Sequence, residues 1–366
     1  MRPVAVMQVT DTLAVGGAER IAVSFANALP RDRFSSHLCT TRAAGPLAAL
    51  LHGDVRRLDL CRRTTLDIKA LVRARSYILE KGISVLHAHG TAVYFAVASA
   101  FLARNCLVVW HAHYGRQAEQ TRAPWPLRLA ARRVAGIIAV SSPLAEWART
   151  RLGVPADRVW CVPNFVVEPL RSPEPPALPG TPGKRIVCVA NLRPEKDHLT
   201  LLDAMKQVVG FEPAASLLLV GCEADPAQAA KVKEQIQHDG LAGHVFLLGS
   251  RNDVGSILRG CDIGVLSSSS EGMPLALLEY GLAGLPVVST AVGQCAEVLA
   301  GGRAGVLVEP HQPDKLAAAL VKLLTAEDLR RTLGKVFKDR VTLEYGERTA
   351  VSRICGIYEK VLGRTL

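Results

Sequence analysis

The sequence lacks the features that mark secreted, zinc-stabilised and membrane-spanning chains. Its nine cysteines are scattered, odd in number and never spaced C-x-x-C, which is typical of free thiols in a reducing compartment and disfavours a zinc site. The longest apolar run, YFAVASAFLA (94–103), is far shorter than the roughly 20 residues that cross a bilayer. The N-terminus reaches Thr10 and Asp11 too soon for a signal peptide. These absences predict a cytoplasmic globular protein.

Acidic residues and lysine are scarce in the first half. Residues 1–167 carry 22 Lys and Arg, 20 of them Arg, against 10 Asp and Glu, a net charge of +12. Residues 168–366 carry 22 against 23, a net charge of −1, and the two halves sum to +11. A field of this sign attracts anions such as nucleic acid, anionic lipid headgroups or a phosphorylated substrate. An Arg-rich composition with no functional meaning is the alternative.

Proline is concentrated in one segment. Residues 168–183 hold six of the 21 prolines, which blocks helix and interior strand and favours an extended connector. We therefore predict an N-terminal domain over 1–167, a Pro-rich linker over 168–183 and a C-terminal domain over 184–346. The last segment, 347–366, has the pattern of an amphipathic helix.

Both halves alternate short apolar runs with helix-like stretches. The runs that predict strands lie at 4–9, 35–41, 84–89, 106–113, 136–141 and 159–164, and then at 185–191, 216–221, 244–249, 263–268, 286–290 and 305–309. Near-continuous apolar strands alternating with helices indicate parallel sheets covered on both faces. The predicted fold class is therefore α/β, with two Rossmann-like domains facing a cleft, and ligands are expected beyond the carboxyl ends of the strands.

The segment SSSSEGMPLALLEYG (267–281) holds the strongest motif. Glu271 is predicted in a loop after a strand, and Pro274 suits the first turn of a helix that would reach past Glu279. Free N–H groups at such a helix start bind anions, and Glu279 could accept hydrogen bonds from a vicinal diol. The alternative is a capped helix with glutamates in its first turns.

Two weaker motifs also follow predicted strands. In ANLRPEKDHLTLL (190–202), Arg193 and Lys196 could neutralise phosphate, or lie in a solvated loop beside their acidic neighbours. In TDTLAVGGAERIAV (10–23), Gly16 and Gly17 open a helix and allow an anion to approach the backbone, or form an ordinary strand–helix turn.

Histidines and an Arg-rich stretch remain. His87 and His89 end one predicted strand, and His111 and His113 end another, where a histidine can donate a hydrogen bond or act as acid or base. A structural role is the alternative for each, and no acidic or cysteine ligand joins them at a spacing typical of a metal site. The segment 124–136, with Trp125, reads as a membrane-surface helix or, preferably, a core helix with a solvated Arg face.

Taken together, these motifs resemble the retaining glycosyltransferases of family 4, which have the two-domain GT-B fold. The resemblance spans nearly the whole chain, since GGAER, LHAHG, VVWHAHYG, VSSPLAEWA, NLRPEKDHLTLL, LLLVG, VFLLGSRNDV, the 261–290 segment and GVLVEP occur in the family's order. Glu271 and Glu279 match its E-x7-E signature. The chain departs from the family where Asn191 replaces the usual arginine, which is displaced to Arg193.

The resemblance implies roles for particular residues. Glu279 would hold the ribose of a nucleotide-diphosphate sugar, and the base would be read by backbone near Ser250 and Arg251. Arg193 and Lys196 would stabilise the leaving diphosphate, so that no metal or other cofactor is expected. The residues that would hold the donor sugar and its phosphates are Glu271, Gly272, Met273, Pro274, Leu275, Gly16, Gly17 and His111.

The resemblance also implies partners and an alternative. The donor would be a UDP-sugar, and the acceptor a saccharide or lipid-linked saccharide of cell-surface glycan synthesis, with retention by a same-face mechanism. The positive first domain suggests an acceptor on an anionic membrane surface, with peripheral attachment to its inner face. A nucleotide-sugar epimerase or a non-catalytic donor-binding subunit is the alternative. Nucleic-acid binding is not expected, because no recognition motif accompanies the arginines. The C-terminal helix is expected to cross back onto the first domain.

Overall fold

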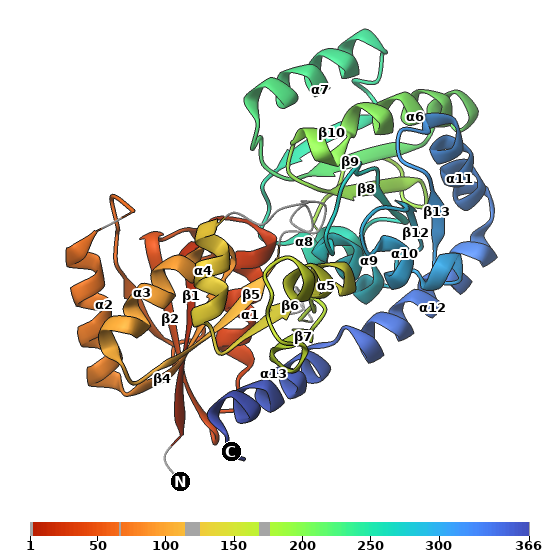
Figure 1. Cartoon of the computed structure of the whole chain (residues 1–366). Coiled ribbons are helices and arrows are strands. Elements are labelled where there is room, and N and C mark those ends of the chain that lie inside the picture. The colour runs from red at the N-terminus through yellow and green to blue at the C-terminus, as the bar shows by residue number, and fades with distance from the viewer. Residues whose placement is uncertain (1–2, 66, 114–124, 168–175, 366) are drawn as a thin grey trace. The chain divides into compact units, whose positions relative to one another are not determined.

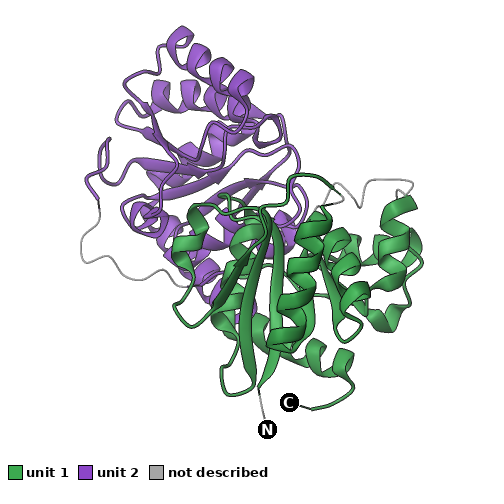
Figure 2. Cartoon of the chain, turned by 90° about the vertical axis from the view of Figure 1, so that its left-hand side faces the viewer, with its two compact units in different colours: residues 1–165, 347–366 green, residues 166–346 purple. Residues whose placement is uncertain are grey.

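The computed structural model describes residues 3–65, 67–113, 125–167 and 176–365, which form two compact α/β units (Figure 1). Unit 1 comprises Met1–Phe165 and Glu347–Leu366, and unit 2 comprises Val166–Gly346 (Figure 2). Of the segment predicted as a linker, 168–175 lie outside the described residues. Residues 176–183 belong to unit 2, where the Arg185 guanidinium donates to the carbonyls of Leu178 and Gly180.

Unit 1 is built on a parallel sheet of seven strands in the order β3-β2-β1-β4-β5-β6-β7. Its strands are β1 (Val4–Thr12), β2 (Phe34–Ala43), β3 (Arg56–Asp59), β4 (Ile83–His89), β5 (Leu107–Ala112), β6 (Gly136–Ala139) and β7 (Val159–Cys161). Its helices are α1 (Gly17–Ala28), α2 (Ile68–Lys81), α3 (Val93–Ala103), α4 (Trp125–Arg133), α5 (Ser142–Thr150) and α13 (Glu347–Leu362). Short 3-10 turns lie at η1 (Pro46–Leu50), η2 (Gly90–Ala92) and η4 (Ala156–Arg158).

Unit 2 is built on a parallel sheet of six strands in the order β10-β9-β8-β11-β12-β13. Its strands are β8 (Arg185–Val189), β9 (Ser216–Val220), β10 (Val245–Gly249), β11 (Ile263–Leu266), β12 (Val287–Thr290) and β13 (Val306–Val308). Its helices are α6 (His198–Phe211), α7 (Pro226–His238), α8 (Val254–Arg259), α9 (Leu275–Ala283), α10 (Cys295–Val298), α11 (Pro313–Thr325) and α12 (Glu327–Glu344), with turns η5 (Pro194–Lys196) and η6 (Ala300–Gly302).

The predicted fold class is confirmed, and each predicted strand matches an observed one to within a few residues. The strand that the sequence pattern did not reveal is β3, whose four residues Arg-Arg-Leu-Asp are exposed or only partly buried at the sheet edge. Charged residues on a short edge strand prevent pairing with another chain, and they also remove the apolar signal by which a strand is recognised.

Successive residues of the unit 1 strands point to opposite faces of the sheet, and the two faces differ in polarity. Apolar residues of β1, β4 and β5, such as Met7, Leu86 and Trp110, point into the core under α2, α3 and α4. Their neighbours Gln8, His87 and His111 must therefore point to the opposite face, where α1 and α13 pack. Among the described residues, every helix is too short or too polar to cross a bilayer.

Helix α13 follows unit 2 in the sequence but belongs to unit 1. Its buried stripe includes Ile354 and Tyr358, and Arg33 donates to Glu359 at 2.6 Å on its outer side. Phe34 meets the Tyr358 ring edge-on. The two ends of the chain thus build one unit together.

Candidate functional site

In unit 2 the strand order reverses between β8 and β11, which are neighbours in the sheet although β9 and β10 separate them in the sequence. Open parallel sheets bind ligands at the carboxyl edge beside such a reversal, because the two loops there diverge to opposite sides. Both of the strongest predicted motifs follow these two strands: 190–196 follows β8 and 267–274 follows β11.

Lys196 and Glu271 meet at this edge. The Lys196 Nζ lies 2.6 Å from Oε1 of Glu271, and the Ser268 hydroxyl donates to the same oxygen at 2.7 Å. The Glu271 side chain is only 8% exposed and that of Lys196 is 23% exposed. The site therefore holds one carboxylate and one ammonium group poised beside each other.

Backbone carbonyls and hydroxyls fix the two loops to each other. Ser267 Oγ donates to the Lys196 carbonyl at 2.9 Å, and the Ser269 backbone N–H donates to the Glu195 carbonyl at 2.9 Å. Thr290 Oγ1, at the end of β12, donates to the Ser268 carbonyl at 2.7 Å. The four serines at 267–270 therefore include three that position the loops, a role that the sequence alone did not indicate.

The loop after β12 packs against the loop that holds Glu271. Gly293 has a φ of +52°, and a Cβ there would lie 2.3 Å from the Glu271 carbonyl oxygen. The next residue, Gln294, donates its backbone N–H to the Gly272 carbonyl at 3.0 Å. Only glycine satisfies both the left-handed backbone and the close approach.

Helix α9 begins at Leu275, and Pro274 is the residue that precedes it rather than one in its first turn. No side chain caps the helix start, and its first turn holds no acidic residue, so its N–H groups and positive dipole end are available to an anion. Glu279 lies one turn further along and is partly buried. Tyr280 anchors the helix, accepting from the Val189 N–H at 2.6 Å and donating to the Val265 carbonyl at 3.2 Å.

Other predicted residues of unit 2 flank this centre. The Arg193 side chain is 53% exposed and lies 4.0 Å from Glu195. Arg251, after β10, donates to Asp253 through Nε at 2.7 Å and Nη2 at 2.6 Å. A cavity of about 100 Å³ opens near the ends of β9 and β10, lined by Leu192, Leu219, Gly221, Glu223, Leu247 and Gly249. Ser250 follows that lining directly.

Burial also keeps the histidine nearest to Lys196 in the sequence, His198, in its neutral form. His198 begins α6 two residues after Lys196 and is fully buried. Burial, with the adjacent Lys196 charge adding to it, lowers the pKa of His198 to about 4. His198 therefore carries no positive charge near neutral pH.

In unit 1 the reversal lies between β1 and β4. Gly16 precedes the first residue of α1, Gly17, and no side chain caps this helix start either. A Cβ on Gly16 would lie 2.3 Å from a carboxylate oxygen of Glu19, in the first turn. The Glu19 carboxylate therefore lies against Gly16 at this helix start.

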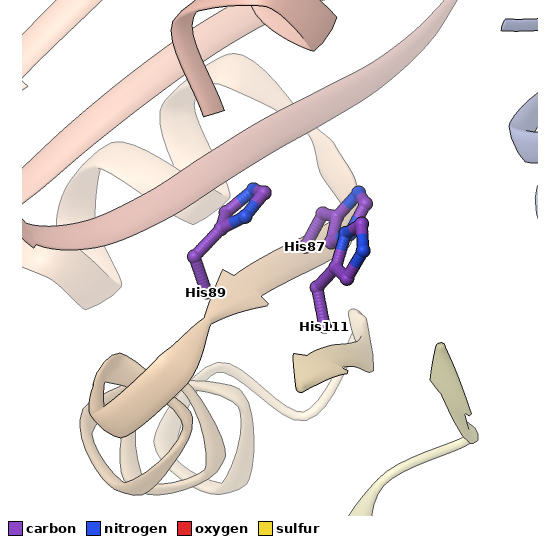
Figure 3. Close-up of side chains that lie close together, drawn as sticks. All are labelled: His87, His89 and His111. Carbon is purple, nitrogen blue, oxygen red and sulfur yellow. The ribbon is translucent and has the colours of Figure 1, made fainter. Parts of the chain in front are cut away.

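The four histidines form one buried network, which Figure 3 shows in part. His87 Nε2 lies 3.1 Å from His111 Nδ1, and His89 Nδ1 lies 3.0 Å from His113 Nε2. Gln8 Oε1 lies 2.8 Å from His89 Nε2, and the Tyr358 hydroxyl lies 2.6 Å from His87 Nδ1. His111 Nε2 is buried without a hydrogen-bond partner among the described residues.

Nitrogen atoms of His87, His89 and His111 lie within 4.8 Å of one another, a separation at which three ligands can share a metal ion. Within the described ranges, no carboxylate or thiol joins this group. A divalent ion there would carry its charge into a buried site with no anion, and would compete with hydrogen bonds already made. The hydrogen-bonded network is the chemistry that these residues fit.

The predicted site residues lie at the carboxyl edge of their own sheet or in the loop beyond it, except Gly17, which lies in α1, and Leu275 and Glu279, which lie in α9. Lys196 and Glu271 meet in unit 2 beside the loop that leads into α9, while unit 1 holds Gly16 and Gly17 at the start of α1 and His111 in β5. Sequence reasoning did not anticipate Ser268, Gln8 and Tyr358. The repeated H-x-H spacing on β4 and β5 was the signal for a shared face, because alternate residues of a strand point the same way.

Comparison with known proteins agrees with this geometry. The model for glycosyltransferase family 4 matches residues 15–168, and the model for glycosyl transferases group 1 matches residues 175–340. The chain is 25% identical over 371 residues to the UDP-Gal:alpha-D-GlcNAc-diphosphoundecaprenol alpha-1,3-galactosyltransferase of Escherichia coli, covering 94% of each chain. It is 27% identical to the phosphatidyl-myo-inositol mannosyltransferase of Mycolicibacterium smegmatis, covering 98% of this chain and 89% of that one.

Solved structures show the same fold. Anabaena Alr3699/HepE, in complex with UDP and glucose, superposes with a TM-score of 0.82 at 20% identity, covering 97% of this chain and 99% of that one. The two-unit α/β architecture is therefore of the GT-B type. The chain belongs to the group 1, family 4 glycosyltransferases.

Proposed function

We propose that this glycosyltransferase moves a hexose from a UDP-sugar to a saccharide or a lipid-linked saccharide, with retention of the anomeric configuration and without a metal ion. The observation that carries the proposal is the Lys196–Glu271 pair at the uncapped start of α9. A helix N-terminus and an ammonium group together bind a diphosphate, and a carboxylate beside them accepts hydrogen bonds from sugar hydroxyls.

The donor's parts are assigned to separate groups of unit 2. Lys196, Arg193 and the N–H groups from Gly272 to Leu275 bind the diphosphate, and Glu271 accepts from the sugar. Glu279 accepts from the ribose diol. The base binds near Ser250 and Arg251, where the cavity beside Gly249 offers a place for it. From unit 1, Gly16 and Gly17 are assigned to the phosphates and His111 to the sugar.

The chemical step then needs electrostatics rather than a nucleophilic side chain. The bond from the anomeric carbon to the diphosphate oxygen breaks, and the developing phosphate charge is stabilised by Lys196, Arg193 and the α9 dipole. The acceptor oxygen attacks the same face, and its proton passes to the leaving phosphate. The charge of the two cations takes the place that a divalent ion fills in other phosphate-transfer sites.

The surface of unit 1 supports an acceptor held on an anionic bilayer. On α4, Leu127 and Ala130 face the core, which agrees with the core-helix reading, whereas Trp125 is 76% exposed and Leu129 is 50% exposed. Helix α3 adjoins α4 (Figure 1). Its Phe101 is 68% exposed. The exposed arginines that accompany them on α4 are Arg128, Arg132 and Arg133. Apolar side chains ringed by arginine suit an interface with anionic lipid.

Calorimetry with UDP-, GDP- and ADP-sugars tests donor binding directly. One donor should bind, and Glu279→Ala should weaken it by about 1–3 kcal/mol, as the loss of a charged hydrogen bond to a diol predicts. Glu234→Ala, an exposed glutamate of α7, is the matched control and should leave the affinity unchanged. Failure of every nucleotide sugar to bind the wild-type chain would contradict the proposal.

Transfer assays with the bound donor separate the alternatives. A saccharide or polyprenyl-diphosphate-linked acceptor should gain one sugar, and proton NMR of the new bond should show the donor's anomeric configuration, with full rate in EDTA. Conversion of the donor to an isomer without an acceptor would identify an epimerase. Binding without any turnover, restored only by another protein, would identify a non-catalytic subunit.

A further inference from the structure

A continuous chain of buried hydrogen bonds runs from Gln8 on β1, through Tyr358 on α13, to the predicted sugar-contacting histidine. It starts at Gln8 Nε2, which lies 3.3 Å from the Tyr358 hydroxyl. It continues over 2.6 Å from that hydroxyl to His87 Nδ1 and over 3.1 Å from His87 Nε2 to His111 Nδ1. It ends at His111 Nε2, which has no partner among the described residues.

The histidines of this chain are neutral. Burial, aided by the neighbouring His113, lowers the pKa of His87 to about 3, and burial lowers the pKa of His111 well below its usual value. A neutral imidazole carries one N–H and one acceptor nitrogen. The direction of each bond therefore dictates that of the next, and only two self-consistent directions exist.

The two directions leave His111 with opposite chemistry. If Tyr358 donates to His87 Nδ1, His87 donates from Nε2 to His111 Nδ1, and His111 Nε2 keeps a hydrogen. If Tyr358 instead accepts from His87, every step reverses and His111 Nε2 presents a bare lone pair. In that second case Tyr358 must donate its hydrogen to the Gln8 amide, turned so that its oxygen faces the hydroxyl.

The distances select the first direction. A hydroxyl donor makes short bonds, near 2.7–2.8 Å, whereas an amide N–H donor makes longer ones. The short contact of Tyr358 is the one to His87, at 2.6 Å, and the long one is to Gln8, at 3.3 Å. With Gln8 Nε2 donating, its Oε1 must accept from His89 Nε2, and that contact is 2.8 Å. This direction requires His89 Nδ1 to accept from His113 Nε2, which lies 3.0 Å away.

We propose that Tyr358 is a positioning residue, which fixes His111 through His87 in the tautomer that keeps a hydrogen on Nε2, where a ligand acceptor can take it. The assignment of that acceptor to the donor sugar or its phosphate rests on the proposed function. Tyr358 itself touches no substrate. A buried donor without a partner is unfavourable until a ligand oxygen accepts its hydrogen bond.

Nitrogen NMR of the ligand-free protein tests the tautomer without any donor. Protein labelled with ¹⁵N-histidine gives, for each of the ten histidines, signals that tell the protonated nitrogen from the bare one. His111→Gln and His87→Gln assign the two residues by loss of their signals. Wild type should show both with hydrogen on Nε2. Hydrogen on His111 Nδ1 would overturn the proposal even if a nucleotide sugar binds.

Tyr358→Phe tests the cause, with Tyr77→Phe as the matched control. Tyr77 also bonds a buried histidine of this sheet, since its hydroxyl lies 2.9 Å from His37 Nδ1, but it lies outside the network. Tyr358→Phe should give His111 both tautomers and, with the two equally populated, weaken UDP-sugar binding about twofold, because only about half of the protein then holds the competent tautomer. Tyr77→Phe should alter only His37. A single unchanged His111 tautomer in Tyr358→Phe would contradict the role of Tyr358.

Ligand titration distinguishes failure of this proposal from failure of the donor proposal. UDP and UDP-glucose are added separately to the labelled wild type, and binding is checked by calorimetry. A shift of the His111 Nε2 signal with UDP-glucose alone supports a bond to the sugar, and a shift with both supports a bond to phosphate. Confirmed binding without any His111 shift overturns the ligand contact, whereas absence of binding contradicts the donor proposal and leaves the tautomer result standing.

Discussion

Lys196 and Glu271, 75 positions apart in the sequence, form an ion pair of 2.6 Å at the carboxyl edge of the unit 2 sheet. Each strand end delivers one partner, and the serine loop holds the carboxylate in place through Ser268. The pair keeps each charge satisfied when no ligand is present. In the proposed function a diphosphate and a sugar would take over the two groups separately, and the pair would be both a stabilising contact and a preformed site.

Removal of the ammonium group should slow transfer much more than it weakens binding. For Lys196→Met we expect kcat to fall about 100-fold, because the leaving phosphate loses one fixed positive charge as its own charge develops. The control is Lys206→Met, which breaks an exposed pair with Asp239 of 3.0 Å in the same unit and should leave kcat unchanged. Steady-state kinetics measure this change. A kcat within twofold of wild type would show that Lys196 does not act in the transfer step.

Substitution of Gly293 should damage both the stability and the donor site. A Cβ at this position meets the Glu271 carbonyl at 2.3 Å, and the φ of +52° is itself unfavourable for alanine. Gly293→Ala should lower the free energy of unfolding by about 1–3 kcal/mol and weaken donor binding, since the 271–274 loop must move. Urea denaturation measures the first effect. Gly210→Ala, where nothing lies within 4 Å of the new Cβ, should show neither.

Acid should destabilise unit 1 before its carboxylates titrate. Burial lowers the pKa of His37 to about 4 and that of His87 and His113 to about 3, whereas the unfolded chain binds protons near 6.5. Between these values the unfolded state holds more protons, so the free energy of unfolding falls as pH falls from 6.5 toward 4. Each of these histidines lowers the free energy of unfolding by up to about 1.4 kcal/mol for each pH unit in this range.

Urea unfolding from pH 7.5 to 5.0 measures this slope. His37→Gln should make it shallower, because one buried neutral histidine is removed. His238→Gln replaces a histidine whose side chain is 81% exposed and should keep the wild-type slope. Equal slopes for wild type and His37→Gln would show that His37 does not contribute to the pH dependence of the free energy of unfolding.

Vesicle binding should follow the exposed apolar residues of α3 and α4. We expect wild type to sediment with vesicles that contain anionic phospholipid and not with neutral ones, and less so after Trp125→Ser with Leu129→Ser, because apolar insertion and charge attraction add. Phe211→Ser removes a side chain that is 66% exposed on unit 2 and serves as the control. Equal sedimentation with neutral and anionic vesicles would contradict the proposed surface.

Sequence patterns predict the two sheets well because a parallel strand buried on both faces is largely apolar, as the runs within Val4–Thr12 and Ser216–Val220 illustrate. The edge strand Arg56–Asp59 escapes this rule because its environment is solvent. The roles of Lys196, Glu271, Glu279 and His111 stay predictions, although their places at the sheet edges follow from the strand order. Tyr358 could not be predicted, because its contact with His87 spans 271 positions and depends on where α13 packs.

The position of α13 has a consequence for how the chain is made. The ribosome reaches Glu347–Leu362 only after it has translated all of Val166–Gly346, yet this helix belongs to the unit whose other residues were made first. Unit 2 can therefore complete its fold during synthesis while unit 1 still exposes Gln8 and His87 to water. The helix that delivers Tyr358 then closes the unit, so the tautomer of His111 is set among the last events of folding.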